Sequence, residues 1–575
     1  MTTTGRPPAP AAASVPAMPW LTRYPDGVDW HMPLHVAPLY RLLEEAVAKY
    51  GELPCTNFLG KTLDYAEIGR LVERAAAGLQ RLGVGKGTKV GLLLPNSPTF
   101  IVYFFAVLKA GGTVVNYNPL YTVAELAGQV KDSDTELMIT LDLKVLFEKV
   151  DALLQSGVLK RAVVCSFPAL LPAGKAALFR LFRSKDLARP LASPARERIV
   201  LEAEVLAGDG RPARVAIDPL TDVAVLQYTG GTTGTPKGAM LTHANVYVNV
   251  QQVSSWAPDL RDGSERVFGV LPFFHVFALT VVMNFGIAKG AEIVIMPRFS
   301  LDEALKLIDK TKPTVMPGVP TLFNAIMNHP KIKSFDLSSL DFCLSGGAAL
   351  PIEVKHRFEA ITGCKVVEGY GLSETSPVVT CNPLEGPVKI GSIGLPLPGT
   401  VISLRDLADP TKEVPVGDKG EICIKGPQVM LGYYRRPAET AEQTVGEFLR
   451  TGDVARMDEE GFFFIEDRIK DLIISSGFNV YPRRIEEAIY EHAAVAEVTV
   501  IGIKDAKRGE APKAFVRMRP GSSVTEAELF EHLKPRISKI EMPAVIEFRD
   551  ELPKTMIGKL SKKELKAEED KRGGA

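Results

Sequence analysis

The sequence predicts a large α/β N-terminal domain, built of β-sheets with crossover helices, followed by a small, mobile α+β C-terminal domain. The 575-residue chain is longer than one hydrophobic core can serve, so two or more domains are expected. Short apolar runs alternate with amphipathic segments over most of its length, the order that parallel sheets with crossover helices produce. After about residue 470 this alternation gives way to the strands and helices of a smaller unit.

The first helix with a clear pattern runs from Asp64 to Val84. Its apolar residues recur at spacings of three and four, and Gly83 supplies a stop signal. The chain then alternates between apolar, β-rich runs and helical segments. We expect a helix at 98–109 and strands at 90–94, 113–117, 137–141, 223–228, 291–296 and 314–316.

The small C-terminal unit is expected to contain strands at 495–503 and 513–518 and helices at 484–491 and 526–533. The charged stretch 466–471 precedes this unit and lies between two apolar runs. Such a stretch is either a hinge between domains or a surface turn within one domain, and its residues alone leave both interpretations open.

Charge and cysteine content exclude several classes of function. The 68 basic residues cancel the 68 acidic ones, so no global field attracts nucleic acid, and no nucleic-acid partner is expected. The six cysteines are scattered along the sequence, which fits neither a disulfide scaffold nor a zinc site. A reducing, cytoplasmic environment is therefore expected.

One stretch has the length of a membrane span. The 22 residues between Arg266 and Lys289 carry no formal charge, which is about what a bilayer requires. Pro272, His275 and Asn284 interrupt the stretch, and its β-rich start is followed by a helical run. We therefore expect a buried strand and core helix here, and no transmembrane segment. The first twenty residues also lack the pattern of a signal peptide.

A second stretch, from Leu170 to Pro190, mixes leucine and phenylalanine with lysine and arginine. A short basic amphipathic segment of this kind lies on a membrane surface or, as we favour, is a solvated helix packed on its domain. Peripheral contact with the inner face of the membrane stays open, as does a homodimer.

The most informative stretch runs from Tyr228 to Gly238 and contains four glycines and four threonines. Glycines let the backbone approach an anion with its N–H groups, threonine hydroxyls add donors, and Lys237 adds a positive charge. A Walker A loop requires Gly-Lys followed by Ser or Thr, whereas Pro236 precedes this lysine and Gly238 follows it. The sequence therefore predicts a phosphate-binding loop of a different nucleotide fold.

This loop resembles the signature of the adenylate-forming superfamily, which includes acyl-CoA synthetases, luciferases and the adenylation domains of peptide synthetases. The other core motifs of that superfamily follow in order at 369–375, 450–453, 467–470, 476–482 and 553–559. The resemblance covers roughly residues 20–565. Within the superfamily, the stretches 20–25, 118–122 and 274–279 are most similar to bacterial long-chain fatty acid–CoA ligases.

The resemblance implies an ATP-dependent reaction in two steps. A carboxylate is a poor electrophile and must gain a leaving group before a thiol can displace it. The substrate oxygen attacks the α-phosphorus of ATP and pyrophosphate leaves, so the protein needs positioning and charge stabilisation rather than its own nucleophile. Coenzyme A then takes the acyl group and AMP leaves. The implied ligands are a fatty acid, ATP, coenzyme A and Mg²⁺.

The resemblance also implies the site residues. Tyr370 is expected to stack on adenine, Asp453 to accept hydrogen bonds from the ribose, and Glu374 with Thr229 to hold Mg²⁺. The expected catalytic residues are Lys559, Glu374, Thr229 and His275. The expected nucleotide-binding residues are Thr229, Gly230, Gly231, Thr232, Thr233, Gly234, Lys237, Gly347, Ala348, Gly369, Tyr370, Gly371, Thr375, Asp453, Arg468 and Lys559.

In this superfamily the small domain rotates about a hinge between the two steps, and the hinge position here is Lys470. The coenzyme A channel is expected at Ser476, Gly477 and Phe478, and the acyl pocket at His275, Phe277, Gly318 and Gly346. The implied organisation is a flexible tail at 1–19, a large domain at 20–466, a hinge at 467–471, a small domain at 472–565 and a tail at 566–575.

The sequence departs from the usual pattern at two places. Ala278 stands where a glycine is often found near the acyl pocket, which leaves the pocket width open, and Phe448 stands where many relatives carry tryptophan. Several alternatives stay open as well: a medium-chain or aryl acid–CoA ligase, an acyl-AMP ligase, a luciferase-like oxidation, and a non-catalytic acyl or nucleotide sensor. The sensor is disfavoured because the expected lysines and carboxylates are all present.

Overall fold

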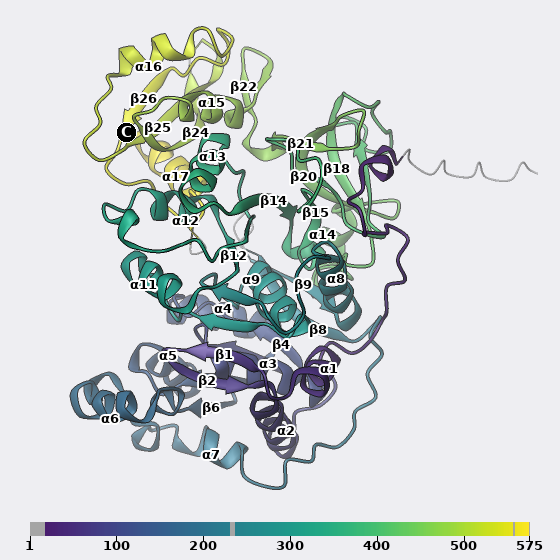
Figure 1. Cartoon of the computed structure of the whole chain (residues 1–575), viewed down its shortest axis with the longest axis vertical. Coiled ribbons are helices and arrows are strands. Elements are labelled where there is room, and N and C mark those ends of the chain that lie inside the picture. The colour runs from purple at the N-terminus through teal and green to yellow at the C-terminus, as the bar shows by residue number, and fades with distance from the viewer. Residues whose placement is uncertain (1–17, 230–235, 506, 556–557, 574–575) are drawn as a thin grey trace, which may run out of the picture.

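The computed structural model describes residues 18–229, 236–505, 507–555 and 558–573 and contains four β-sheets with their covering helices (Figure 1). The predicted strands and helices occur at the expected places, with bounds that differ by a few residues. The expected phosphate-loop residues Gly230, Gly231, Thr232, Thr233 and Gly234 lie outside the described residues.

A seven-stranded sheet forms one layer of the large domain. All its neighbouring strands are parallel except β8 and β9, which form an antiparallel pair. In order across the sheet, the strands are β7 (Ile199–Leu201), β6 (Arg161–Cys165), β5 (Thr135–Leu141), β3 (Lys89–Leu93), β4 (Thr113–Asn116), β8 (Val223–Thr229) and β9 (Lys237–Thr242). The helices that connect these strands include α3 (Pro98–Lys109), α4 (Val123–Ser133), α5 (Lys144–Gln155), α6 (Ala173–Phe182) and α7 (Glu202–Val205).

A nine-stranded sheet forms the second layer. In order, its strands are β16 (Leu395–Pro396), β15 (Val378–Cys381), β14 (Lys365–Gly371), β13 (Phe342–Ser345), β12 (Val315–Gly318), β10 (Arg266–Gly269), β11 (Glu292–Ile295), β1 (Pro54–Phe58) and β2 (Lys61–Asp64). Its helices include α1 (Arg41–Tyr50), α2 (Tyr65–Arg81), α8 (His243–Ser255), α11 (Leu301–Thr311), α12 (Pro320–Met327) and α13 (Ile352–Thr362).

Helix α2 begins where the sequence predicts because of its cap. The side chain of Asp64 accepts a hydrogen bond from the backbone N–H of Glu67, and the Glu67 carboxylate accepts one from the N–H of Asp64. This reciprocal capping box satisfies two backbone donors at the helix start. A second capping box begins α8, where Thr242 and Asn245 exchange the same pair of hydrogen bonds.

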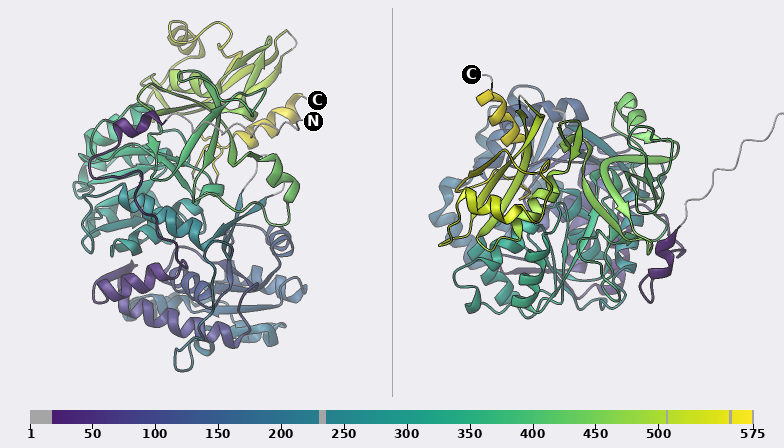
Figure 2. Two further views of the ribbon diagram at one scale, coloured as in Figure 1. Left: turned by 90° about the vertical axis from the view of Figure 1, so that its right-hand side faces the viewer. Right: turned by 90° about the horizontal axis from the view of Figure 1, so that it is seen from above.

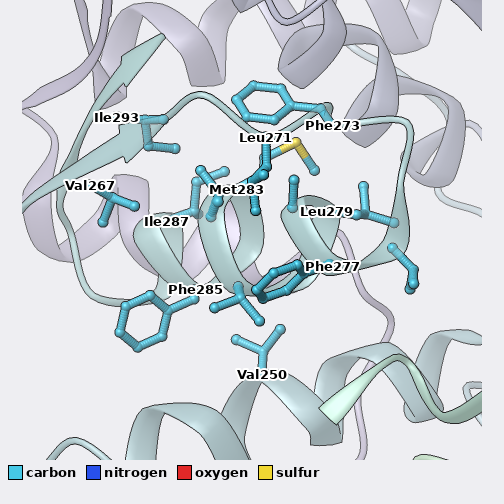
Figure 3. Close-up of a cluster of buried hydrophobic side chains, with 14 of the residues drawn as sticks. Val250, Val267, Leu271, Phe273, Phe277, Leu279, Met283, Phe285, Ile287 and Ile293 are labelled. Carbon is cyan, nitrogen blue, oxygen red and sulfur yellow. The ribbon is translucent and has the colours of Figure 1, made fainter. Parts of the chain in front are cut away.

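The uncharged stretch between Arg266 and Lys289 is core, as predicted. It forms strand β10, the short helix α9 (Val276–Ala278), a π-helical turn at Leu279–Asn284 and helix α10 (Phe285–Ala288). Figure 3 shows Ile287 beside Val267 and Ile293 of the nine-stranded sheet, and Phe277 on the side of Val250. Among the described residues, no helix is long and apolar enough to cross a membrane.

A third sheet, which the sequence patterns did not predict, follows the nine-stranded one. It has five strands: β17 (Val401–Arg405), β18 (Lys419–Lys425), β19 (Thr444–Val445), β20 (Phe448–Met457) and β21 (Phe463–Arg468). The short helix α14 (Pro437–Glu442) precedes β19. Strand β21 leads through a 3₁₀ turn at Ile469–Asp471 into the small domain, so the expected hinge lies directly at the end of this sheet.

The small domain lies at one end of the molecule, at the top of Figure 1 and of the left view in Figure 2. Its sheet contains β22 (Ile473–Ser475), β23 (Phe478–Val480), β24 (Val495–Asp505), β25 (Gly509–Met518) and β26 (Val545–Phe548). Its helices are α15 (Pro482–Tyr490), α16 (Glu526–Leu533) and α17 (Lys562–Gly573).

The structure corrects the expected C-terminal tail. Most of the stretch from residue 566 onward is the continuation of helix α17 rather than a tail. Ion pairs hold this helix to the small domain and to the turn that precedes it: Glu569 Oε1 lies 2.9 Å from Lys513 Nζ, and Lys566 Nζ lies 3.0 Å from Asp471 Oδ1. The helix is highly polar and gives no apolar periodicity, which is why the sequence pattern missed it.

Candidate active site

Lys559 of the small domain reaches the large domain beside Gly347. A methyl group on Gly347 would lie only 2.7 Å from the Cε atom of this lysine, so the glycine leaves the space that the lysine side chain fills. Two hydrogen bonds fix the loop that carries Lys559, one from the large domain and one within the loop itself. Thr321 of α12 donates a 2.6 Å hydrogen bond to the carbonyl of Gly558, and the N–H of Lys559 donates to the hydroxyl of Thr555.

Burial changes the protonation of this lysine and of the histidine near it. The pKa of Lys559 falls to about 8, first because the amine is desolvated and second because the Arg468 charge repels it. The pKa of His275 falls to about 3, again mainly through burial, with a further contribution from the charge of Lys559. At pH 7 the lysine is therefore mostly charged and the histidine is neutral.

Tyr370, Asp453 and Arg468 form one cluster. The Tyr370 hydroxyl donates a 2.6 Å hydrogen bond to one carboxylate oxygen of Asp453, and Arg468 Nε lies 2.8 Å from the other. The cluster is built by the fold, because Tyr370 lies near the end of β14 while Asp453 and Arg468 are paired across β20 and β21. Burial and the Asp453 charge raise the pKa of Tyr370. A carboxylate has about four acceptor positions, so Asp453 can still accept hydroxyl protons of a sugar.

The loop after β14 places Glu374 and Thr375 differently. The carboxylate of Glu374 accepts a 2.7 Å hydrogen bond from the hydroxyl of Tyr433, and its carbonyl accepts one from the N–H of Met430. Thr375 is fully buried, and its hydroxyl donates to the carbonyl of Pro377. The hydroxyl of Thr375 is therefore engaged within the loop in the described structure, whereas the carboxylate of Glu374 points away from the loop backbone toward Tyr433.

Thr229 and Lys237 lie opposite each other at the base of the phosphate loop. They are partners in the antiparallel pairing of β8 with β9. The Nζ atom of Lys237 lies 5.1 Å from the centre of the Tyr433 ring. Tyr433 thus contacts both the cation that is expected to bind phosphate and the carboxylate that is expected to hold Mg²⁺. Sequence reasoning missed this tyrosine, and no motif on which that reasoning relied contains it.

The expected acyl-pocket residues lie together. The N–H of Gly346 donates to the carbonyl of Gly318, since β12 and β13 are neighbours. A Cβ atom on Gly346 would lie 2.9 Å from the Phe277 ring. His275 lies just before Phe277 and accepts a hydrogen bond from its backbone N–H. Next to this group, the buried Ser345 hydroxyl has no hydrogen-bond partner among the described residues.

An apolar cavity lies between α8 and the nine-stranded sheet. Its walls come from α8, the π-helical turn, α10 and four strands of the nine-stranded sheet. Its lining residues are Val253, Trp256, Ala257, Val281, Phe285, Val315, Pro317, Phe342, Leu344, Val367, Val378, Cys381, Leu384 and Leu397. Neither a charged side chain nor an amide or hydroxyl side chain lines it, so it suits a hydrocarbon.

The residues expected at the coenzyme A channel and the hinge lie outside the cluster of Tyr370, Asp453 and Arg468 or at its border. Ser476 and Gly477 form the two-residue turn between β22 and β23, both with positive φ, and Phe478 beside them is 64% exposed. The expected coenzyme A channel therefore lies on an exposed hairpin. Lys470 lies in the 3₁₀ turn near Arg468. The pKa of Lys470 is lowered, first because its amine is buried and second because the Arg468 charge repels it.

The other glycines and the alanine of the expected nucleotide site lie at strand ends. Gly369 and Gly371 belong to the C-terminal end of strand β14, and a Cβ atom on Gly371 would collide with the carbonyl of Pro377. Gly347 and Ala348 are exposed in the loop after β13.

Known proteins share both the sequence and the fold. The profile of the AMP-binding enzyme family matches residues 43–434, and that of the AMP-binding enzyme C-terminal domain matches residues 484–559. The chain is 43% identical to a long-chain-fatty-acid–CoA ligase of Bacillus subtilis (strain 168), over 96% of this chain and 98% of the relative. It is 39% identical to a ligase of the same name from Yersinia pestis, with the same coverage.

A further relative has a different substrate in its name. A feruloyl-CoA synthase of Amycolatopsis sp is 36% identical over 88% of this chain and 94% of the relative. Among solved structures, ATP-bound MatB from Rhodopseudomonas palustris is 27% identical with a TM-score of 0.78, covering 92% of this chain and 98% of that one. An anthranilate CoA ligase has the same fold: it is 24% identical with a TM-score of 0.81, covering 95% of this chain and 99% of that one.

The two matched profiles cover both domains, and the structural neighbours share the large α/β domain and the small C-terminal domain. The resemblance inferred from the motifs is therefore confirmed. This chain belongs to the AMP-binding enzyme family.

Proposed function

We propose that the protein is a long-chain fatty acid–CoA ligase. It would convert a fatty acid and ATP to acyl-AMP and pyrophosphate, and then transfer the acyl group to coenzyme A with release of AMP. The observation that carries this proposal is the position of Lys559, whose side chain lies beside Gly347 and interacts with the charges of Arg468 and Asp453. Its charge also acts on His275. The family and the names of the relatives agree with it.

The charged groups fit an in-line attack on a phosphate. The fatty acid carboxylate oxygen would form a bond to the α-phosphorus while the bond to pyrophosphate breaks. Lys559 would offset the negative charge shared by the carboxylate and the α-phosphate, and Lys237 would offset that of the leaving pyrophosphate. The cluster around Asp453 would hold the ribose, and Tyr370 would lie against the adenine.

A magnesium ion fits the donors of this site. Glu374 offers a carboxylate oriented by Tyr433, and Thr229 offers a hydroxyl at the base of the phosphate loop. Mg²⁺ typically binds through one or two carboxylates together with substrate phosphates. When bound, it would neutralise phosphate charge. The chain's own contribution is to fix Glu374 through the Tyr433 hydroxyl.

The second step is proposed to follow a rotation of the small domain. The large domain (20–466) and small domain (472–565) would move about the hinge at 467–471, with Lys470 as its pivot. Rotation would withdraw Lys559 and bring the hairpin with Ser476, Gly477 and Phe478 toward the acyl-AMP. The coenzyme A thiolate would attack the acyl carbonyl and AMP would leave.

We propose a long alkyl chain as the substrate because two of the relatives are named long-chain-fatty-acid–CoA ligases, and the apolar lining of the cavity between α8 and the nine-stranded sheet agrees with an alkyl group. An aryl acid is the second candidate, since a feruloyl-CoA synthase is among the relatives. The working location would be the cytoplasm, and a homodimer stays a prediction.

Product analysis tests this function. Purified protein is incubated with ATP, Mg²⁺, coenzyme A and one acid at a time, from acetate through oleate and including ferulate, and thioesters are quantified by mass spectrometry. A maximum at long alkyl chains is expected. A maximum at ferulate would move the assignment to an aryl acid ligase, acyl-AMP without thioester would indicate an acyl-AMP ligase, and the absence of both products would indicate a sensor.

A further inference from the structure

Helix α6 (Ala173–Phe182) carries apolar side chains on two opposite faces. The inner face contains Ala176, which is buried, and Phe179, whose ring centre lies 5.1 Å from that of Phe167. These contacts already anchor the helix to the large domain. The outer face contains Leu178, Leu181 and Phe182, which are 56%, 71% and 70% exposed.

An outer face of this kind is unusual for a surface helix. Helices on globular proteins normally turn polar residues to the solvent and one apolar stripe to the core. Leu181 and Phe182 stand three and four residues after Leu178, so both lie next to it on the helix surface. Contiguous exposed apolar side chains bordered by polar ones mark an interaction surface.

Positively charged residues flank these side chains in the sequence. The segment from Ala173 to Leu191 contains five basic residues and one acidic residue, Asp186. We call the following set the basic apolar face: Leu178, Leu181, Phe182, Lys175, Lys185 and Arg189. Arg180 and Arg183 stand four residues after Ala176 and Phe179, so they lie on the inner side of the helix. The concentration is local, because the whole chain has no net charge.

The cations are only partly neutralised by the protein. Arg183 pairs with Asp186, and the amine of Lys175 donates to the carbonyl of Leu59. Arg180 interacts with the charge of Asp142. Within the described part of the chain, Lys185 and Arg189 have no ion pair, and both are exposed.

We propose that the basic apolar face docks this protein on the surface of an anionic phospholipid bilayer. A bilayer interface accepts leucine and phenylalanine side chains below its headgroups while anionic lipids attract the surrounding lysines and arginines. A protein partner would have to match both features with its own apolar and acidic side chains. The bilayer supplies both without a specific shape, and the combination of positive charge with contiguous large apolar groups favours it.

The position of the face in the molecule allows such docking. Helix α6 lies at the lower edge of the molecule in Figure 1, at the opposite end from the small domain. In the left view of Figure 2, which is turned by 90°, the small domain again lies at the top and the part of the large domain that contains α6 lies below. A bilayer on this face would therefore leave the small domain free to move. The docking does not depend on the proposed reaction and can be tested without any acyl substrate.

Vesicle flotation with the full-length protein tests the proposal. Vesicles of phosphatidylcholine alone are compared with vesicles that also contain phosphatidylglycerol, at low and high salt. The wild-type protein is expected to bind the anionic vesicles and to be released by salt. The variant L178S/L181S/F182S should bind them at least roughly tenfold more weakly, and K185Q/R189Q should lose about fivefold per charge.

Matched substitutions elsewhere serve as controls. Leu220 is 61% exposed and the Lys160 side chain is 73% exposed, so L220S and K160Q remove the same kinds of group outside the basic apolar face. Both should bind like the wild type, and thermal melting should show that all variants are folded. Failure of the wild type to bind anionic vesicles, or unchanged binding by the triple variant, would overturn the proposal. So would a dimer in solution that the triple variant dissociates without any vesicle binding.

Discussion

The hydroxyl of Tyr433 donates a 2.7 Å hydrogen bond to the carboxylate of Glu374. The ring of the same tyrosine lies 5.1 Å from Lys237 Nζ. One side chain from the segment after the third sheet's β18 thus touches two groups that the motifs place at the triphosphate. Burial and the Glu374 charge raise the pKa of Tyr433, so it keeps its proton and stays a donor.

Removing this hydroxyl should impair adenylation. In Tyr433→Phe the carboxylate of Glu374 loses a donor that fixes its orientation. A hydrogen bond to a charged group contributes about 1.5–3 kcal/mol, so we expect kcat/KM for pyrophosphate release to fall roughly 10- to 100-fold. The concentration of Mg²⁺ needed for half-maximal rate should rise at the same time.

The neighbouring tyrosine provides the control. The Tyr434 hydroxyl donates to Asp134 rather than to Glu374, at 2.9 Å. Tyr434→Phe also loses one hydroxyl and one carboxylate contact, yet it should leave the Mg²⁺ requirement unchanged. Equal shifts of the Mg²⁺ requirement in both variants would contradict the role assigned to Tyr433.

Adenylation should depend on pH through Lys559. The pKa of this lysine is lowered from 10.5 to about 8, so its charge is present below pH 8 and is lost as the pH rises through that value. The neutral amine cannot stabilise the carboxylate and phosphate charges. We therefore expect kcat/KM for pyrophosphate release to decline above about pH 8, with the enzyme otherwise folded.

Two further measurements isolate this titration. The release of pyrophosphate must be followed without coenzyme A, because the thiol itself titrates at alkaline pH. Lys559→Arg should remove the decline at pH 8, since a guanidinium stays charged throughout this range. A decline that persists in the arginine variant would assign the titration to another group.

Gly347 should be required for the position of Lys559. A Cβ atom there would lie 2.7 Å from Lys559 Cε, and the residue has a φ of +80°. In Gly347→Ala the lysine must move, so we expect adenylation to fall about tenfold or more. Backbone strain adds a loss of roughly 1–2 kcal/mol in the free energy of unfolding.

Gly363 separates the two effects. It has a similar φ of +75°, at the end of α13, and a Cβ atom there would meet nothing within 4 Å. Gly363→Ala should lower the melting temperature by a similar amount without changing the adenylation rate of the folded enzyme. If both variants lost activity alike, strain rather than contact with Lys559 would explain the effect.

Local sequence signals predicted much of the fold. Helix α2 has apolar residues at helical spacing together with a complete capping box, and both signals lie within the helix and its immediate flank. The strands of the seven-stranded sheet are short apolar runs buried on both faces, which is typical of parallel sheets. In these elements local preference and tertiary packing favour the same structure.

The features that were missed depend on residues far apart in the chain. Helix α17 is too polar for its packing to be read from periodicity, and its ion pairs reach Lys513 and Asp471. Tyr433 meets Glu374 only because the chain, after β18, runs along β9 at the edge of the seven-stranded sheet. No spacing rule within one segment contains such information.

The candidate site could be assembled from the sequence only through the resemblance of its motifs. The structure brings Lys559, Gly347, Tyr370, Asp453 and Arg468 into one region, as a shared nucleotide site requires. It leaves the hairpin of the expected coenzyme A channel exposed on the small domain. The motif order alone gives the set of residues, but the domain arrangement decides which of them meet at a given step.

The most direct test of a single site that alternates between two steps is Lys559→Ala, measured in each half-reaction separately. Formation of acyl-AMP is followed by pyrophosphate release, and thioester formation is followed from supplied acyl-AMP and coenzyme A. We expect adenylation to fall about 100-fold or more, the scale of losing one charge-stabilising group, while thioester formation from acyl-AMP survives. Equal losses in both half-reactions would contradict the account.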